Sequence, residues 1–158
     1  MPCATRTFPI EKELWLTRCT LEIIDRYGFG AAVLTKSDLV LRDLELLERI
    51  NRKTKAVVQM TVTTHDEKLC HIIEPNVCTT KRRFEVLAEC KRLGIPTVVW
   101  LSPILPFIND KEENIQLILD DCIRTGVHAI LCFDIGVTRS VLATASTFMR
   151  HSTATFPE

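Results

Sequence analysis

Polar residues that could do chemistry follow the apolar segments of this chain. Lys36 and Ser37 come after one such segment, Thr61 and Thr63 close the next, and Ser102 follows a third. In parallel α/β folds, functional groups collect at the carboxyl ends of the strands. A lysine ammonium there can pair with a carboxylate as a point charge, and a lysine amine can form a Schiff base with a carbonyl substrate.

Each of these residues also has an ordinary structural role. Lys36 could be a solvated loop lysine, and Ser37 could cap the following helix. Threonines in a strand reflect β-propensity, and the prolines after Ser102 make a rigid turn. Glu74 precedes a proline and is more often a helix end than a reacting group. Asp134, after the last apolar segment, could face a substrate or be a structural loop carboxylate.

Helical and apolar segments alternate along the chain. Apolar residues at three- and four-residue spacing predict helices over 11–27, 41–50, 66–73, 80–93 and 110–123. Short apolar runs predict strands over 31–35, 56–62, 97–101 and 129–133, and the strand at 31–35 is expected to be buried on both faces. We expect Thr80 to cap one helix, and Asp110 with Glu113 to form a capping box for another.

Glycines separate several of these helices from the next strand. Gly28, Gly94 and Gly126 stand at such points, as in a βα array. Right-handed crossovers make the strands parallel, so the predicted class is α/β with a parallel sheet. Periodicity alone leaves an open doubly wound sheet and an arc of a barrel as alternatives. The sequence has neither GxGxxG nor GxxxxGK[ST], so a nucleotide phosphate loop has no support.

Composition narrows the functional classes. Basic and acidic residues number 20 each, so net charge gives no case for non-specific binding to nucleic acid or membrane. No apolar run approaches the roughly 20 residues of a membrane-spanning helix, and the start lacks a signal-peptide pattern, so we expect a cytoplasmic protein. The 7 cysteines are scattered singly, with no metal-binding cluster and no metal ligands predicted. The histidines share no metal-like spacing.

A set of ordered segments resembles the spore-photoproduct-lyase-like proteins of the radical S-adenosylmethionine (SAM) superfamily. The likeness runs from about Pro9 to about Thr138. Its segments are Pro9–Leu14, Tyr27–Gly30, Thr35–Asp38, Thr61–Thr64, Glu74–Pro75, Arg83–Phe84, Gly94–Pro96 and Pro103–Pro106. The set and its order carry the resemblance, because no single tetrapeptide is specific.

The resemblance implies the C-terminal portion of a partial (βα)6 TIM-like barrel. Residues 9–138 would hold strands three to six, between a divergent start at 1–8 and a divergent, poorly packed tail at 139–158. In the family, a 4Fe-4S cluster reductively cleaves SAM to a 5′-deoxyadenosyl radical. The CxxxCxxC loop that binds the cluster is absent from this chain. DNA is a partner only by analogy with the photoproduct lyase, and the substrate is unknown.

Site residues carry over one by one from the resemblance. Lys36 resembles the lysine that approaches the SAM carboxylate, with Ser37 beside it. Thr61 resembles the strand-end hydroxyl that contacts the SAM ribose or amino group, and Thr63 is the alternative on the same face. Ser102 begins the strand end that packs around the adenine. No catalytic residue is assigned.

Both ends of the chain depart from the family pattern. The DPYxP and YFYxxLDxxF segments of the family are missing, and reading freely chosen codons one base earlier can restore similar segments. The ends are thus hypothesised to be frameshifted remnants of a longer gene. An exposed edge strand at 31–35 would favour self-association.

Three functional readings stay open. The chain could be part of a radical SAM lyase-like enzyme, inactive when isolated. It could be a non-catalytic remnant, or a subunit whose partner supplies the cluster. It could also be an unrelated Schiff-base barrel enzyme that uses Lys36.

Overall fold

The computed structural model describes residues 3–4 and 11–132 of the 158-residue chain. Within them, five parallel strands form one sheet in the order β1-β2-β3-β4-β5. The strands are β1 (Cys3–Ala4), β2 (Ala31–Thr35), β3 (Ala56–Val62), β4 (Thr97–Leu101) and β5 (Ala129–Cys132). The predicted α/β class and parallel sheet are therefore confirmed.

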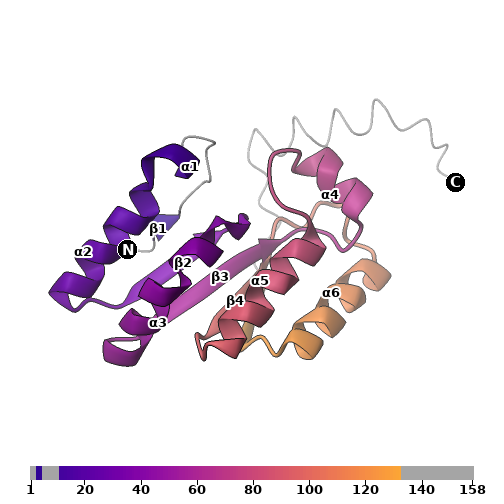
Figure 1. Ribbon diagram of the computed structural model, residues 1–158. Helices are drawn as coiled ribbons and strands as arrows, with labels where there is room; N and C mark the ends of the chain where they lie inside the picture. Colours follow the sequence, from indigo (N-terminus) through magenta and orange to yellow (C-terminus); the bar gives the residue numbers. More distant parts are fainter. Residues whose placement is uncertain (1–2, 5–10, 133–158) are drawn as a thin grey trace, which may run out of the picture.

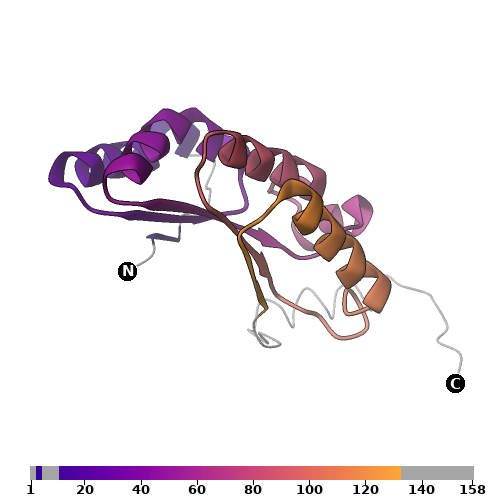
Figure 2. The same cartoon turned by 90° about the horizontal axis from the view of Figure 1, so that it is seen from below.

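Helices connect the strands and cover one face of the sheet (Figure 1; Figure 2). They are α1 (Glu11–Leu14), α2 (Leu16–Tyr27), α3 (Leu44–Lys53), α4 (Glu67–Ile73), α5 (Thr80–Arg92) and α6 (Glu112–Thr125), with the 3-10 helix η1 (Asp38–Asp43) after β2. None of the helices in this part of the chain is long and apolar enough to cross a membrane.

The core lies between the sheet and its helices. Along β2, β3 and β4, buried residues alternate with half-buried ones, so only the face toward the helices is fully covered. The prediction that the strand at 31–35 is buried on both faces is therefore wrong, because the described residues place helices on one face of the sheet only (Figure 2). Fully buried core side chains include Leu47, Ile50, Val58, Met60, Val62, Val86, Leu87, Val99 and Ile118.

The expected helix over 11–27 is interrupted at Trp15. This residue has φ 54°, and α2 begins directly after it. The Glu11 carboxylate accepts a hydrogen bond from Thr17 N (3.1 Å), which caps α2 across the break. The Arg42 guanidinium stacks over the Trp15 ring at 4.6 Å from its centroid. Side-chain contacts from outside the helix thus override its local periodicity.

The predicted helix caps are only partly correct. Gly28 and Gly126 end α2 and α6 in the left-handed conformation, as expected for C-cap glycines. Thr79, not Thr80, caps α5, because the Thr80 hydroxyl instead donates to Thr64 O (2.5 Å). The capping box at Asp110 and Glu113 does not form, since α6 starts after Lys111 without a side-chain cap.

The edge of the sheet also differs from expectation. The short strand β1 pairs with β2 at Cys3 with Val33 and at Ala4 with Leu34. Part of the edge that was expected to be open is therefore occupied by the chain's own backbone. Self-association through this edge stays a prediction. Asp134 and the tail at 139–158 lie outside the described residues.

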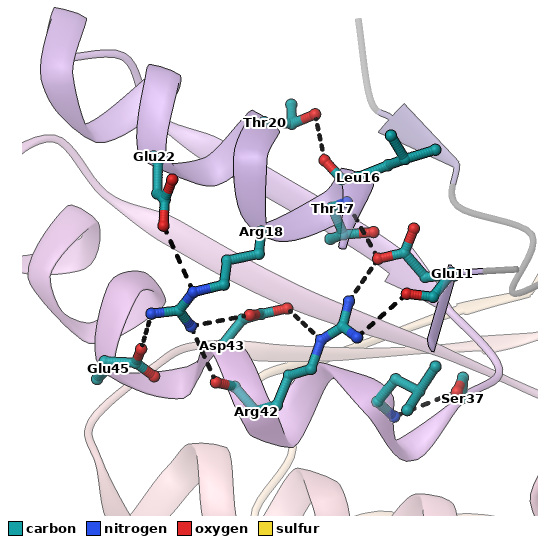
Figure 3. Close-up of polar contacts among 11 residues, drawn as sticks. Glu11, Leu16, Thr17, Arg18, Thr20, Glu22, Ser37, Arg42, Asp43 and Glu45 are labelled. Atoms are coloured by element: carbon teal, nitrogen blue, oxygen red, sulfur yellow. Dashed lines mark hydrogen bonds and ion pairs between the residues drawn. The ribbon is translucent and has the colours of Figure 1, made fainter. Parts of the chain in front are cut away.

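An ionic clamp anchors the segment that follows β2 (Figure 3). Asp43, at the end of η1, is 1% exposed and accepts from Arg18 Nη1 (3.2 Å) and Arg42 Nε (3.4 Å). Arg42 also donates to Glu11 Oε1 (2.5 Å). The clamp joins α1, α2 and η1 and lines a cavity of about 20 Å³, enough for one water molecule. The clamp thereby fixes η1, whose N-cap residue Ser37 directly follows Lys36.

We expect Asp43→Asn to destabilise the fold. The substitution removes the buried charge shared by Arg18 and Arg42, which keep Glu45 and Glu11 as ion-pair partners, so we expect a loss of roughly 2 kcal/mol in the free energy of unfolding. Denaturant unfolding measures this loss. Asp38→Asn is the matched control, because its ion pair with Arg82 is largely exposed and should change stability little. Equal effects of the two substitutions would contradict the role of the clamp.

Candidate functional site

A buried carboxylate joins three segments near the carboxyl ends of β2 and β3. Glu74, just after α4, has a side chain that is 10% exposed. Its Oε1 atom accepts a hydrogen bond from Thr63 Oγ1 (3.0 Å) and forms an ion pair with Lys36 Nζ. Its Oε2 atom accepts from Arg83 Nη2 (2.7 Å). Glu74 therefore connects the loop after β2, the end of β3 and helix α5.

Arg83 is fully buried and fixed by several acceptors. Its Nη1 donates to Thr61 O (2.8 Å) and its Nε donates to Cys78 O (3.0 Å). With the Glu74 contact, the three guanidinium nitrogens all have an oxygen partner. A charged side chain tolerates such burial only when it is paired and hydrogen-bonded in this way.

Burial and ion pairing act in opposite directions on Glu74. Burial disfavours its charged form, but attraction to Lys36 and Arg83, with their hydrogen bonds, outweighs burial and lowers the pKa of Glu74 below its ordinary value of 4.5. Glu74 is therefore ionised at neutral pH.

The charges of this group do not cancel. One carboxylate, Glu74, is shared by two cations, so one positive charge is left over. Arg83 is 0% exposed and has its donors committed, whereas the Lys36 side chain is 32% exposed. The excess positive charge is thus accessible at Lys36, where an incoming anion could bind.

The loop after β4 is tied to the same end of the sheet. Asn109, which is 3% exposed, donates to Thr63 O (2.7 Å) and Pro103 O (3.0 Å) and accepts from Leu105 N (2.6 Å). Ser102 lies half-buried at the start of this loop. These hydrogen bonds fix the loop after β4 against Thr63 at the end of β3.

The structure groups some of the predicted site residues and separates others. Lys36 and Thr63 meet on the Glu74 carboxylate. Ser37 accepts from Leu39 N (3.2 Å) and caps η1, which is its ordinary structural role. Thr61 is half-buried within β3 and contributes its carbonyl to Arg83. Contact of Ser37, Thr61 or Ser102 with a cofactor stays a prediction.

Sequence reasoning missed the importance of Glu74, Arg83 and Asn109. A signal for Arg83 was present, because it falls on the buried stripe of α5 with Thr80, Leu87 and Cys90. A charged residue on such a stripe requires a partner carboxylate. Glu74 could have been recognised as the carboxylate partner of Arg83, but it was interpreted as a helix end. Asn109 had no comparable signal.

The described cysteines do not suit an iron–sulfur cluster. Clusters need several thiolates in one place. Burial raises the pKa of both Cys90 and Cys122 to about 12, so their thiols stay protonated. Cys78 also has a raised pKa, chiefly from burial, and donates to Lys36 O (3.1 Å). Among residues 3–4 and 11–132, no three His, Cys, Asp or Glu side chains are grouped to hold a metal.

Comparison with known proteins gives relatives and a shared fold. No family model matches the chain. An uncharacterized protein of Methanocaldococcus jannaschii is 36% identical over 104 residues, which are 66% of this chain and 39% of the relative. An uncharacterized protein of Acidianus two-tailed virus is 33% identical over 106 residues, or 65% and 35% of the two chains. The chain thus matches little more than a third of these relatives.

A solved structure has the same architecture. It is a domain of pyruvate-formate lyase-activating enzyme from Bacteroides vulgatus, with a TM-score of 0.62 over 93% of this chain and 91% of that chain. At 14% sequence identity, this likeness concerns the fold alone. It supports the expected radical-SAM-like fold, and the parallel sheet is consistent with a partial barrel.

The pKa of Glu74 makes a prediction about acid stability. Because this pKa is lower in the folded chain than in the unfolded chain, the ionised carboxylate stabilises the fold fully above pH 4.5. This stabilisation is lost as pH falls through the lower, folded-state pKa. We expect the free energy of unfolding to decrease below pH 4.5 with a steeper slope in the wild type than in Glu74→Gln. Chemical denaturation at a series of pH values measures both slopes, and identical slopes would contradict the assignment.

Proposed function

We propose that this chain contributes the carboxylate-binding part of a SAM site in a protein of radical SAM type, closest to the spore-photoproduct-lyase-like proteins. The observation that carries the proposal is the excess positive charge at Lys36, exposed near the carboxyl ends of β2 and β3. Parallel α/β folds bind their ligands at this end of the sheet. The sequence resemblance assigns the same lysine to the SAM carboxylate.

The chemistry of the donors fits a single carboxylate. The Lys36 ammonium has three N–H donors, and the structure gives Glu74 as the side-chain partner of this ammonium. Donors remain for a ligand oxygen without breaking the ion pair. Thr63 and Glu74 hold the lysine beside the end of β3. The chain's own residues thus bind and orient an anion.

The described residues do not supply the iron–sulfur cluster that radical SAM chemistry uses. The cluster reduces SAM when it is present in such enzymes. Here Cys90 and Cys122 are held as thiols, and no metal-binding group occurs in the part of the chain that the structure describes. Radical formation therefore requires cysteines from another polypeptide, or from a longer form of this one. Without them, the chain is a non-catalytic remnant.

The match to relatives is consistent with a partial protein. The aligned residues make up 35% and 39% of the two relatives described above. Catalysis, substrate choice and any contact with DNA would belong to the longer protein. We propose lyase activity only for such a complete protein.

We expect Lys36→Met to weaken SAM binding by about tenfold or more, because a charged hydrogen bond to the carboxylate is lost. Isothermal titration calorimetry measures this, with 5′-methylthioadenosine as the matched ligand that lacks the carboxylate. Binding of 5′-methylthioadenosine should be unchanged. Lys68→Met, on the exposed side of α4, is the control variant. Equal SAM binding by the wild type and Lys36→Met would refute the proposal.

The Schiff-base reading makes a different prediction. A Schiff-base lysine attacks as a neutral amine, whereas Lys36 lies in an ion pair with Glu74. We expect borohydride treatment with small aldehydes and ketones to leave Lys36 no more modified than Lys68. Mass spectrometry of the digested chain measures this. Selective reduction of an adduct onto Lys36 would favour the Schiff-base enzyme instead.

A further inference from the structure

The Glu74 carboxylate lies between two cations that differ in their access to ligands. Arg83 is buried and holds backbone carbonyls as well as Glu74. Lys36 contacts the same carboxylate from the partly exposed side. The neighbouring Arg82 is shared by Asp38 (3.0 Å) and Glu85 (2.9 Å) in a more exposed position, where solvent screens their charges more strongly. The group of Lys36, Glu74 and Arg83 is itself left with a single positive charge.

We propose that Glu74 is a specificity-determining residue that restricts the Lys36 site to ligands with a singly charged anionic group. This inference rests on the proposed anion binding at Lys36. A monocarboxylate neutralises the excess charge of the site. A doubly charged sulfate or phosphate group brings a second negative charge toward the Glu74 carboxylate, and that repulsion is weakly screened at a partly buried position.

Arg83 has a complementary part in this selection. Its hydrogen bond holds the Glu74 carboxylate in place, while Lys36 contributes more than Arg83 to lowering the pKa of Glu74, so the selecting charge is present at neutral pH. Removal of Glu74 alone would leave two positive charges, and removal of Arg83 alone would leave none. Removal of both restores the single charge of Lys36. Glu74 and Arg83 therefore set the net charge of the site, whereas Lys36 is the residue that contacts the ligand.

The test compares acetate with sulfate at constant ionic strength. Lys36 is acetylated with an N-hydroxysuccinimide ester at increasing concentrations of each anion. Mass spectrometry measures the acetylation rate and gives the anion concentration at which this rate is halved. The readout is the ratio of the two concentrations within one variant. A change in folded fraction affects both anions equally, so it cancels from this ratio.

We expect Glu74→Gln to shift the ratio toward sulfate by about tenfold, since one nearby like charge is removed. Arg83→Met should shift it toward acetate. The double variant Glu74→Gln with Arg83→Met should return the ratio to the wild-type value, and it replaces a buried ion pair without leaving a lone charge. If Glu74→Gln does not fold, the effect of the Glu74 charge is obtained by comparing Arg83→Met with the double variant, because these two differ only in that charge.

A ratio that is the same in all folded variants would overturn the selective role of Glu74 while leaving anion binding at Lys36 intact. Protection of Lys36 by neither anion in any variant would overturn the proposed anion site, and this inference with it. A ratio that follows net charge in the stated order supports the inference.

Discussion

The site depends on one buried carboxylate shared between two cations. Glu74 is ionised at 10% exposure of its side chain because Lys36 and Arg83 both pair with it, and Arg83 is fully buried with Glu74 as its carboxylate partner. The same ion pairs bring the loop after β2, the end of β3 and helix α5 together. Because two positive charges meet one negative charge, the arrangement also leaves a positive charge at Lys36. The ion pairs that stabilise this end of the sheet therefore also create the positive charge on which the proposed anion site depends.

The sequence predicted the architecture well because the strands and most helices have strong local patterns. Short apolar runs located the strands from β2 to β5, and glycines located the ends of α2 and α6. The break at Trp15 and the capping of α5 could not be predicted, because Arg42 and Thr64 contribute contacts from distant parts of the chain. Local propensity has no information on such contacts.

The candidate site was predicted only in part. The family resemblance pointed to Lys36, and to Thr63 as the alternative to Thr61, and the structure brings Lys36 and Thr63 to Glu74. Glu74 itself was assigned to a helix end, since a glutamate before a proline has no pattern that reveals a buried ion pair. For Ser37 the sequence offered a ligand-binding role and a helix cap, and its hydroxyl caps η1, while contact with a ligand stays a prediction. Spacing thus locates a site, whereas the pairing of charges within it depends on packing.

Nuclear magnetic resonance can test most directly whether the Lys36 ammonium binds the SAM carboxylate. Lys36 is assigned by loss of its signal in Lys36→Met, and its side-chain Cε resonance is followed as ligands are added. We expect SAM to shift this resonance and 5′-methylthioadenosine to leave it in place. If the Lys36 signal does not change with SAM while other residues respond to the ligand, Lys36 does not bind the carboxylate.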